Sequence, residues 1–289
     1  MSFSEKYQNI YNTVSEDIER VKKEVLLELK NSFELTSDLE QLFNSPSKHI
    51  RAALSLLYLK ANNIEADENQ IKFQAIIELI HNGSLIHDDI IDNSDIRRNH
   101  TTLNASHGNH LSVIAGDLVL SFALKKIAEL NSGTVLKLVS DTITRMCEGE
   151  IHQYYSKYKI PTEKEYITKT YNKTGTLFET AIKGAAILSG NTDNIKNAEL
   201  FGKYFGIAFQ IRDDIKNIEN NQPDSDIKNG IYTAAVIYSN NPDNPSEGIE
   251  KAKALLDNYV RKAENTISDI KKNKYKSAII ELLELINHE

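Results

Sequence analysis

The chain has little of what builds several familiar classes of protein. Its 289 residues include one cysteine, five prolines, twelve glycines and no tryptophan. The single cysteine, Cys147, excludes an internal disulfide framework and suits a reducing compartment, so we expect a cytoplasmic protein. The scarcity of proline and glycine is typical of long helices that are joined by few turns.

Two kinds of segment are also missing. The most apolar stretch, Val113 to Leu124, is shorter than the roughly 18 residues of a membrane span, and Gly116-Asp117 interrupts it. The polar N-terminus, Met1 to Arg20, has no apolar core of a signal peptide. The net charge of -7 argues against a nucleic-acid partner, because phosphate backbones require a basic face.

Apolar residues recur every three or four positions along most of the chain, which predicts helices. The first predicted helix carries Ile10, Val14, Ile18, Val21, Val25 and Leu29 on one face. Further helices are predicted through Ala52 to Ala61, with a cap at Ser45 or Ser47, then over about 67–92, 110–131, 133–158, 162–190 and 193–219, with a helical hairpin after 246. No hairpin signals separate alternating strands. We therefore predict an all-α chain without sheet beyond incidental pairs, and a single domain over 1–289.

Two acidic clusters lie in apolar, helix-forming surroundings: Asp88-Asp89-Ile90-Ile91-Asp92 and Asp213-Asp214-Ile215-Lys216-Asn217. Residues four apart share a helix face, so Asp88 and Asp92 project the same way. Carboxylates about 5 Å apart repel by roughly 3 kcal/mol at an effective dielectric constant of about 20. One such cluster alone is more simply a solvated helix surface. Two of them favour a site for Mg2+, which binds one or two carboxylates together with substrate phosphates.

Four motifs carry a resemblance to a known family. The stretch His81 to Arg98, H-N-G-S-L-I-H-D-D-I-I-D-N-S-D-I-R-R, resembles the first aspartate-rich motif of the trans-isoprenyl diphosphate synthases, or polyprenyl synthetases. F-Q-I-R-D-D at 209–214 resembles their second such motif, K-T-G-T-L-F at 173–178 their lysine-threonine signature, and E-G-E-I-H-Q at 148–153 their acidic-glycine-acidic stretch. The motifs follow the family order and spacing over residues 45–235, and they look most like those of geranylgeranyl diphosphate synthases.

The resemblance implies a fold, a reaction and a partner. The fold is an isoprenoid-synthase-type bundle of about ten or more mostly antiparallel helices around a central active-site cavity. The reaction is Mg2+-dependent prenyl transfer, in which isopentenyl diphosphate condenses with dimethylallyl, geranyl or farnesyl diphosphate to a longer all-trans prenyl diphosphate. Two to three Mg2+ ions with bound diphosphate, and a homodimer, are expected from the same resemblance.

Residue roles follow from the same match. The expected metal ligands are Asp88, Asp89, Asp92, Asp213 and Asp214, and the first four of these form the catalytic set together with Lys173. The allylic diphosphate is expected to meet Arg97, Lys173, Thr174 and Gln210. Isopentenyl diphosphate binds without metal in this family, and Lys48, Arg51, His81 and Arg98 match the positions that hold it.

Product length is expected to depend on Gly83 and Ser84. They precede Asp88 by four to five residues, about 6 to 7.5 Å along a helix axis. Short-chain members of the family commonly have an aromatic residue at one of these places. Small residues here predict an open tunnel and products of twenty carbons or more, unless both residues merely permit close helix packing.

The chain also departs from the family pattern. His49 stands for an arginine, Asn99 for a glycine, Asn217 for a carboxylate and Ile231 for a lysine, and the two glycines before Lys48 are replaced. We expect Ile231 and Asn99 each to remove a substrate contact or a tight turn, Asn217 to make the second cluster bind metal less strongly or bind fewer ions, and the activity to be reduced or altered. Two alternatives stay open. One is a class I terpene cyclase on the same fold, although the second cluster lacks that class's spaced Asn/Ser/Glu triad. The other is a catalytically weakened regulatory subunit or helical scaffold, which Ile231 and Asn99 favour.

Overall fold

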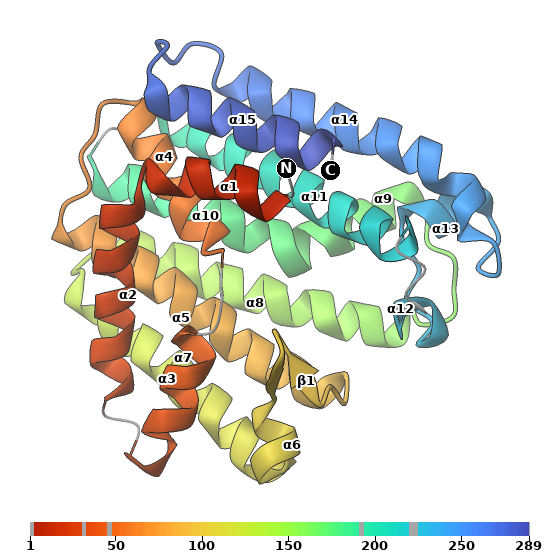
Figure 1. Ribbon diagram of the computed structural model, residues 1–289, viewed down its shortest axis with the longest axis horizontal. Coiled ribbons are helices and arrows are strands. Elements are labelled where there is room, and N and C mark those ends of the chain that lie inside the picture. Colours follow the sequence, from red (N-terminus) through yellow and green to blue (C-terminus); the bar gives the residue numbers. More distant parts are fainter. Residues whose placement is uncertain (1–2, 31–32, 45–47, 191–193, 220–224, 289) are drawn as a thin grey trace. The chain divides into compact units, whose positions relative to one another are not determined.

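The computed structural model describes residues 3–30, 33–44, 48–190, 194–219 and 225–288, and most of them lie in helices (Figure 1). The prediction of an all-α chain is confirmed. Contacts divide the chain into two compact units. The N-terminal unit is Val14–Leu136, and the C-terminal unit combines Met1–Thr13 with Lys137–Glu289. The single domain stays a prediction. No helix among the described residues is long and apolar enough to cross a membrane.

The N-terminal unit is built around one long buried helix, α5. Its elements are α2 (Ser15–Leu29), η1 (Phe33–Leu35), α3 (Thr36–Asn44), α4 (Ile50–Ala61), α5 (Glu68–Ile91), strands β1 (Ile96–Arg97) and β2 (His100–Thr101), α6 (Leu103–His107) and α7 (Asn109–Glu129). A capping box starts α5, because Asp67 accepts from the backbone of Asn69 and Gln70 while Gln70 accepts from the backbone of Asp67. α2, α4 and α7 pack against α5 and enclose its apolar side chains.

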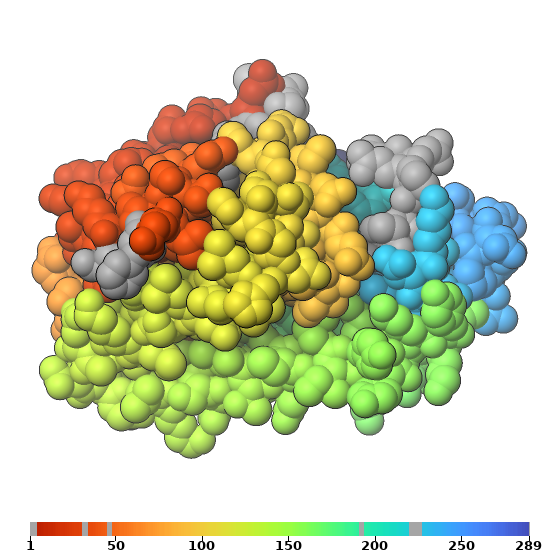
Figure 2. All heavy atoms as spheres, turned by 90° about the horizontal axis from the view of Figure 1, so that it is seen from below, coloured from red at the N-terminus to blue at the C-terminus, as the bar shows by residue number. Residues whose placement is uncertain are grey.

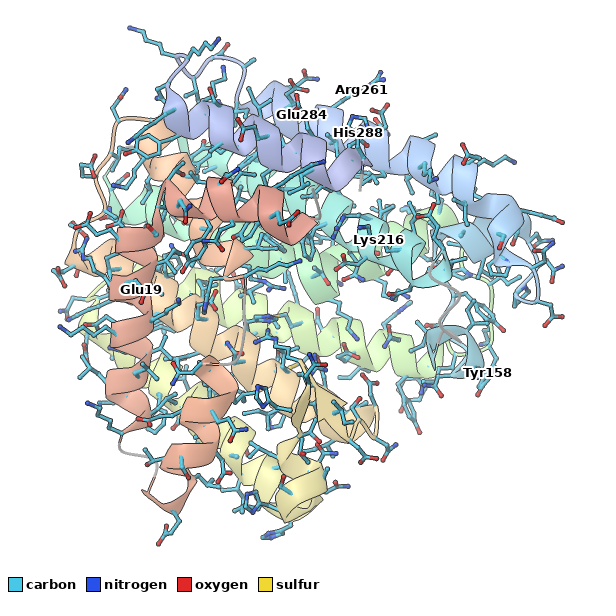
Figure 3. The ribbon with its side chains drawn as sticks, in the orientation of Figure 1. Glu19, Tyr158, Lys216, Arg261, Glu284 and His288 are labelled. Atoms are coloured by element: carbon cyan, nitrogen blue, oxygen red, sulfur yellow. The ribbon has the colours of Figure 1, made fainter. Side chains whose placement is uncertain are left out.

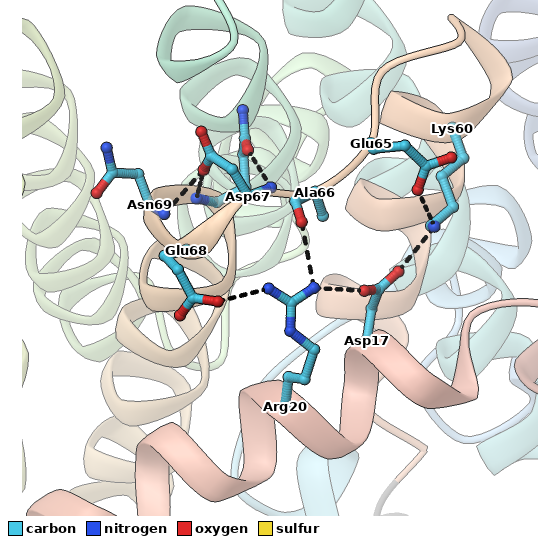
Figure 4. A network of polar contacts seen from close by, with 9 residues as sticks. Asp17, Arg20, Lys60, Glu65, Ala66, Asp67, Glu68 and Asn69 are labelled. Atoms are coloured by element: carbon cyan, nitrogen blue, oxygen red, sulfur yellow. Dashed lines mark hydrogen bonds and ion pairs between the residues drawn. The ribbon is translucent and has the colours of Figure 1, made fainter.

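A polar network ties α2 to the segment between α4 and α5 (Figure 4). Arg20 donates to Asp17 at 2.9 Å, to the Ala66 carbonyl at 3.2 Å and to Glu68 at 2.8 Å. Lys60 on α4 pairs with the other oxygen of Asp17 at 3.0 Å. Asp17 is buried, so these two cations provide the partners that a buried carboxylate needs.

The short hairpin after α5 contains two residues of the predicted site. β1 and β2 are antiparallel, with Arg97 opposite His100, and form part of the yellow surface in Figure 2. The two turn residues, Arg98 and Asn99, have φ of 52° and 65°. Two successive left-handed residues are typical of the tight type I′ hairpin turn, in which asparagine is favoured. The expectation that Asn99 removes a tight turn was therefore wrong, because asparagine adopts the conformation that the glycine would supply.

The C-terminal unit is built around α11. It contains α1 (Phe3–Asn12), most of α8 (Gly133–Tyr155), α9 (Glu163–Thr170), the π-helical turn η2 (Tyr171–Gly175), α10 (Thr176–Leu188), α11 (Ile195–Glu219), α12 (Ser225–Lys228), α13 (Ala234–Ser239), η4 (Pro245–Gly248), α14 (Ile249–Thr266) and α15 (Lys274–His288). α10, α13 and α14 pack against α11, while α1 lies along α15 (Figure 1). Two glycines let α11 approach its neighbours closely: a Cβ at Gly202 or Gly206 would lie 2.6 Å from the Cα of Glu179 or Gly175, respectively.

Several predicted boundaries are confirmed and two are not. Breaks occur near 131–133 and 160–162, as expected, and Thr162 caps α9. The first predicted helix is two helices, because Thr13 turns both its backbone and its hydroxyl to the Ile10 carbonyl and ends α1. The predicted helix over 162–190 is interrupted by η2, a π-helical turn that the apolar spacing did not reveal. Ser45 and Ser47 lie outside the described residues, as does most of the polar loop expected at 220–226.

Candidate active site

The first acidic cluster lies at the C-terminal end of α5. Asp89 is buried and accepts from Nε of Arg97 on β1 at 2.6 Å, whereas Asp88 is half-buried and Asp92 is exposed. Burial raises the pKa of Asp89, against the opposing effect of Arg97, and the charge of Asp92 adds to the increase. Carboxylates at a helix C-terminus also face the negative end of the macrodipole. The position therefore favours a bound cation on electrostatic grounds.

The second acidic cluster lies near the end of α11, and its two aspartates have different surroundings. The side chain of Asp213 is 39% exposed, and its Oδ1 accepts a hydrogen bond from Nη1 of Arg212 at 3.0 Å. Asp214 is buried, and its Oδ2 and Oδ1 accept from Tyr166 at 2.6 Å and from Gln210 at 2.8 Å. Asn217 is exposed one turn later. Asp213 thus presents its carboxylate toward the surface, while Asp214 is held by protein donors.

Lys173 and Thr174 lie on the π-helical turn η2. Lys173 pairs with Glu150 of α8 at 2.6 Å, and Thr174 donates to Oε1 of Gln210 at 2.7 Å. A Cβ at Gly149 would lie 3.1 Å from the Cβ of Asn172, so the glycine lets α8 approach this turn. The lysine-threonine signature, the acidic-glycine-acidic stretch and the second acidic cluster therefore meet within the C-terminal unit.

A basic cluster surrounds one buried acid in the N-terminal unit. Glu78 of α5 is 3% exposed, and its carboxylate lies 2.8 Å from Nδ1 of His49. Burial alone would raise the pKa of Glu78, but His49, Arg51 and Arg98 lower it, so the group stays charged. Glu78 thus holds together basic residues from the start of α4 and from the β1–β2 turn.

Two members of this basic cluster point to an anionic ligand. Burial, then Arg51 and Arg98, hold the pKa of His81 well below its usual value, so His81 is a neutral hydrogen-bonding group. Burial also lowers the pKa of Arg98, whose buried Nη1 has no hydrogen-bond partner among the described residues. A guanidinium with a buried, unused N–H donor is suited to a phosphate oxygen. Lys48, next to His49, is exposed.

The family model named polyprenyl synthetase matches residues 33–278 of this chain. The chain belongs to the polyprenyl synthetase family. It is 35% identical over 216 residues to a prenyl transferase of Cyanophora paradoxa and 34% identical over 208 residues to an octaprenyl diphosphate synthase of Haemophilus influenzae. Each match covers 71% of this chain, and 67% and 63% of those proteins, so the chain spans about two thirds of their length.

The fold is shared with solved polyprenyl synthases. One from Caulobacter crescentus CB15, complexed with calcium and isoprenyl diphosphate, has a TM-score of 0.89 at 20% identity, with 98% of both chains covered. The family and the fold class predicted from the motifs are both confirmed. The roles of individual residues remain predictions. The structure adds the hydrogen-bond and ion-pair partners of these residues.

Three members of this polyprenyl synthetase site were not predicted from its sequence. Glu150 and Glu78 are acidic residues on predicted helices with apolar neighbours. An acidic residue in such a place is expected to pair with a cation, so these two could have been found. Tyr166, the donor to Asp214, fits the apolar period of its helix and gave no signal of its own.

Gly83 and Ser84, the two residues predicted to set product length, have different surroundings in the structure. Gly83 is buried, and a Cβ there would lie 3.1 Å from Cγ of Leu120 on α7. Gly83 thus faces α7 in the way that close helix packing requires. Ser84 is half-buried, and its hydroxyl donates to the His81 carbonyl at 2.8 Å.

Ile231 stands where the family resemblance expects a lysine. The preceding Gly230 accepts from the backbone of Tyr158, which lies at the edge of the C-terminal unit (Figure 3). Ile231 lines a small cavity of about 20 Å³ together with Lys159 and Lys169. Two lysines, Lys159 and Lys169, thus lie around the segment in which Ile231 replaces the expected lysine.

Proposed function

We propose that this polyprenyl synthetase is a Mg2+-dependent prenyltransferase that condenses isopentenyl diphosphate with an allylic diphosphate. Its product is a longer all-trans prenyl diphosphate of twenty carbons or more. The observation that carries the proposal is the basic cluster around the buried Glu78, which offers a metal-free anion site in addition to two acidic clusters. A terpene cyclase has one diphosphate substrate and no use for that second site. Long products are supported by the relatives, among them an octaprenyl diphosphate synthase.

The donor set fits Mg2+. Asp88, Asp89, Asp92, Asp213 and Asp214 offer hard oxygen ligands, and Mg2+ usually combines one or two carboxylates with substrate phosphates. No group of three or more His, Cys, Asp or Glu side chains within the described ranges is arranged to hold an ion alone. Shared binding by carboxylates and diphosphate therefore suits this chain, with two to three ions proposed. When bound, Mg2+ supplies Lewis-acid neutralisation of the diphosphate leaving group.

The chain's own residues bind and orient the substrates. Arg97, held by Asp89, and Lys173, held by Glu150, offer cationic donors to the allylic diphosphate. Gln210 adds a neutral N–H donor beside them, and Thr174, whose hydroxyl donates to the Gln210 amide oxygen, holds that amide in place. For isopentenyl diphosphate, Lys48, Arg51 and Arg98 provide charge and His81 a neutral hydrogen bond.

We further propose a homodimer, a cytoplasmic location and one functional domain over residues 1–289. The dimer is supported by three large apolar side chains that α7 leaves exposed: Val113, Ile114 and Leu124 are 44%, 48% and 52% exposed. Exposed apolar side chains are common at association surfaces. The exposed thiol of Cys147 suits a reducing compartment.

The function is tested by incubating the protein with Mg2+, labelled isopentenyl diphosphate and each allylic primer in turn, followed by chromatography of dephosphorylated products. We expect labelled prenyl alcohols of twenty carbons or more. Cyclic hydrocarbons from unlabelled primer alone would identify a cyclase. Binding of diphosphate without any product from any primer would favour a regulatory subunit or scaffold.

Replacing Arg51 or Arg98 by alanine is expected to raise the KM for isopentenyl diphosphate selectively. One charge-assisted hydrogen bond contributes roughly 1.5 to 3 kcal/mol, so the KM should rise about 10- to 100-fold while that for the primer changes little. Steady-state kinetics with each substrate varied in turn measures both values. Arg261→Ala is the control, because that arginine is exposed and pairs with Asp257 one turn away in the same helix. Equal increases for both substrates would assign these arginines to general stability.

A further inference from the structure

Tyr166 is a buried tyrosine whose hydroxyl contacts the second acidic cluster. It lies on α9 with 1% of its surface exposed, and its hydroxyl donates to Oδ2 of Asp214 at 2.6 Å. The phenol is the donor in this contact, because a charged carboxylate can only accept hydrogen bonds. The partner positions are 48 residues apart in the sequence.

Asp214 also binds Gln210. The second carboxylate oxygen, Oδ1, accepts from Nε2 of Gln210 at 2.8 Å. Because a charged carboxylate can only accept hydrogen bonds, the nitrogen of the Gln210 amide must face Asp214. The amide oxygen then faces Thr174, whose hydroxyl donates to it at 2.7 Å. One chain of hydrogen bonds therefore connects Tyr166, Asp214, Gln210 and Thr174 and sets the orientation of each group.

This arrangement leaves specific donors for a ligand. The amide nitrogen of Gln210 has two hydrogens, of which the bond to Asp214 uses one. Asp213, one residue before Asp214 and about 100° around the helix, has a side chain that is 39% exposed. Adjacent aspartates thus have different surroundings: one is turned into the protein toward Tyr166, and the other toward the surface.

We propose that Tyr166 is a positioning residue of the second acidic cluster. By holding Asp214, it keeps the Gln210 amide, with Thr174 on its other side, in the orientation in which its free N–H meets the diphosphate of the allylic substrate. The inference rests on the proposed prenyl transfer and deepens it by adding a residue that does not touch the substrate. A purely structural tyrosine would contribute to stability but would not distinguish between the two substrates.

The test removes the Tyr166 hydroxyl alone. Tyr166→Phe keeps the ring in its buried site and leaves an oxygen of Asp214 without its donor. Tyr238→Phe is a matched control, because the Tyr238 hydroxyl also donates to a carboxylate at 2.6 Å, that of the exposed Glu163. Both variants are compared with wild type by calorimetric titration with inorganic diphosphate in the presence of Mg2+, and by steady-state kinetics with both substrates.

Tyr166→Phe should weaken diphosphate binding and raise the KM for the allylic primer about 10- to 100-fold, since a hydrogen bond to a charged group contributes roughly 1.5 to 3 kcal/mol. The KM for isopentenyl diphosphate should change by less than about threefold, as should all constants of Tyr238→Phe. In a Gln210→Ala background the same substitution should have little further effect, because contacting residues of one network are not additive.

Some outcomes would overturn the inference. They are an equal loss for both substrates, a full additional loss in the Gln210→Ala background, or a lower Tm with unchanged diphosphate affinity. If Tyr166→Phe does not fold, Asp214→Asn serves instead, and wild-type diphosphate affinity in that variant would overturn the proposal. If wild type binds diphosphate but makes no prenyl product, a selective weakening by Tyr166→Phe still supports the positioning role while the proposed function fails.

Discussion

Replacing Asp88 or Asp213 by alanine is expected to reduce turnover about 10³-fold or more and to leave the helical fold intact. A metal ion that neutralises a diphosphate leaving group contributes several kcal/mol to the transition state, and each 1.4 kcal/mol is about tenfold in rate. Stability should change little, because the Asp213 side chain is 39% exposed and Asp88 lies at the unfavourable end of the α5 dipole.

The measurement is kcat at saturating Mg2+, with far-UV circular dichroism and Tm for each variant. Asp141→Ala is a matched control: Asp141 lies on α8, is 45% exposed, and pairs with Lys137 one turn away on the same helix. Its removal should alter neither rate nor stability noticeably. Near-normal turnover in both Asp88→Ala and Asp213→Ala would show that the acidic clusters do not bind the catalytic metal.

Replacing Ser84 by phenylalanine is expected to shorten the products from twenty carbons or more to fifteen or fewer. Ser84 lies about 6 Å along the α5 axis from Asp88, at a level that a chain anchored there must pass. It is half-buried, so an aromatic ring has room to enter the proposed tunnel without first displacing core residues. The comparison is the product-length distribution from the same primer with wild type and Ser84→Phe.

Gly83→Phe provides an informative contrast. Its Cβ would lie 3.1 Å from Cγ of Leu120 and 3.4 Å from Cγ1 of Val119, so a ring there must force α5 and α7 apart. Overpacking of this kind typically costs about 1 to 3 kcal/mol, which predicts a lower Tm as well as altered products. If wild type already stops at fifteen carbons, or Ser84→Phe makes the wild-type lengths, the tunnel does not pass Ser84.

Local pattern was a good guide to the helices because each one needs only an apolar face at the helical period. The spacing of Ile10, Val14, Ile18 and Val21 predicted buried positions, and all of these side chains are buried. The same pattern missed the break at Thr13, because Ile10 and Val14 keep the helical spacing across it, and it also missed the π-helical turn at Tyr171–Gly175. At Asn99 the sequence was misread in the other direction. This residue replaces the glycine that the family resemblance expects, yet it keeps the tight turn.

The sequence by itself determined the family and the helical class and predicted many residues of the candidate site, because the motifs are contiguous and the helical period is local. Only the tertiary structure decided the partner of each residue: Arg97 for Asp89, His49 for Glu78, Tyr166 for Asp214, and α7 for Gly83. Most of these partners are far apart in the chain, and their pairing depends on how helices pack. Packing is set by many apolar contacts together, so no single motif contains it.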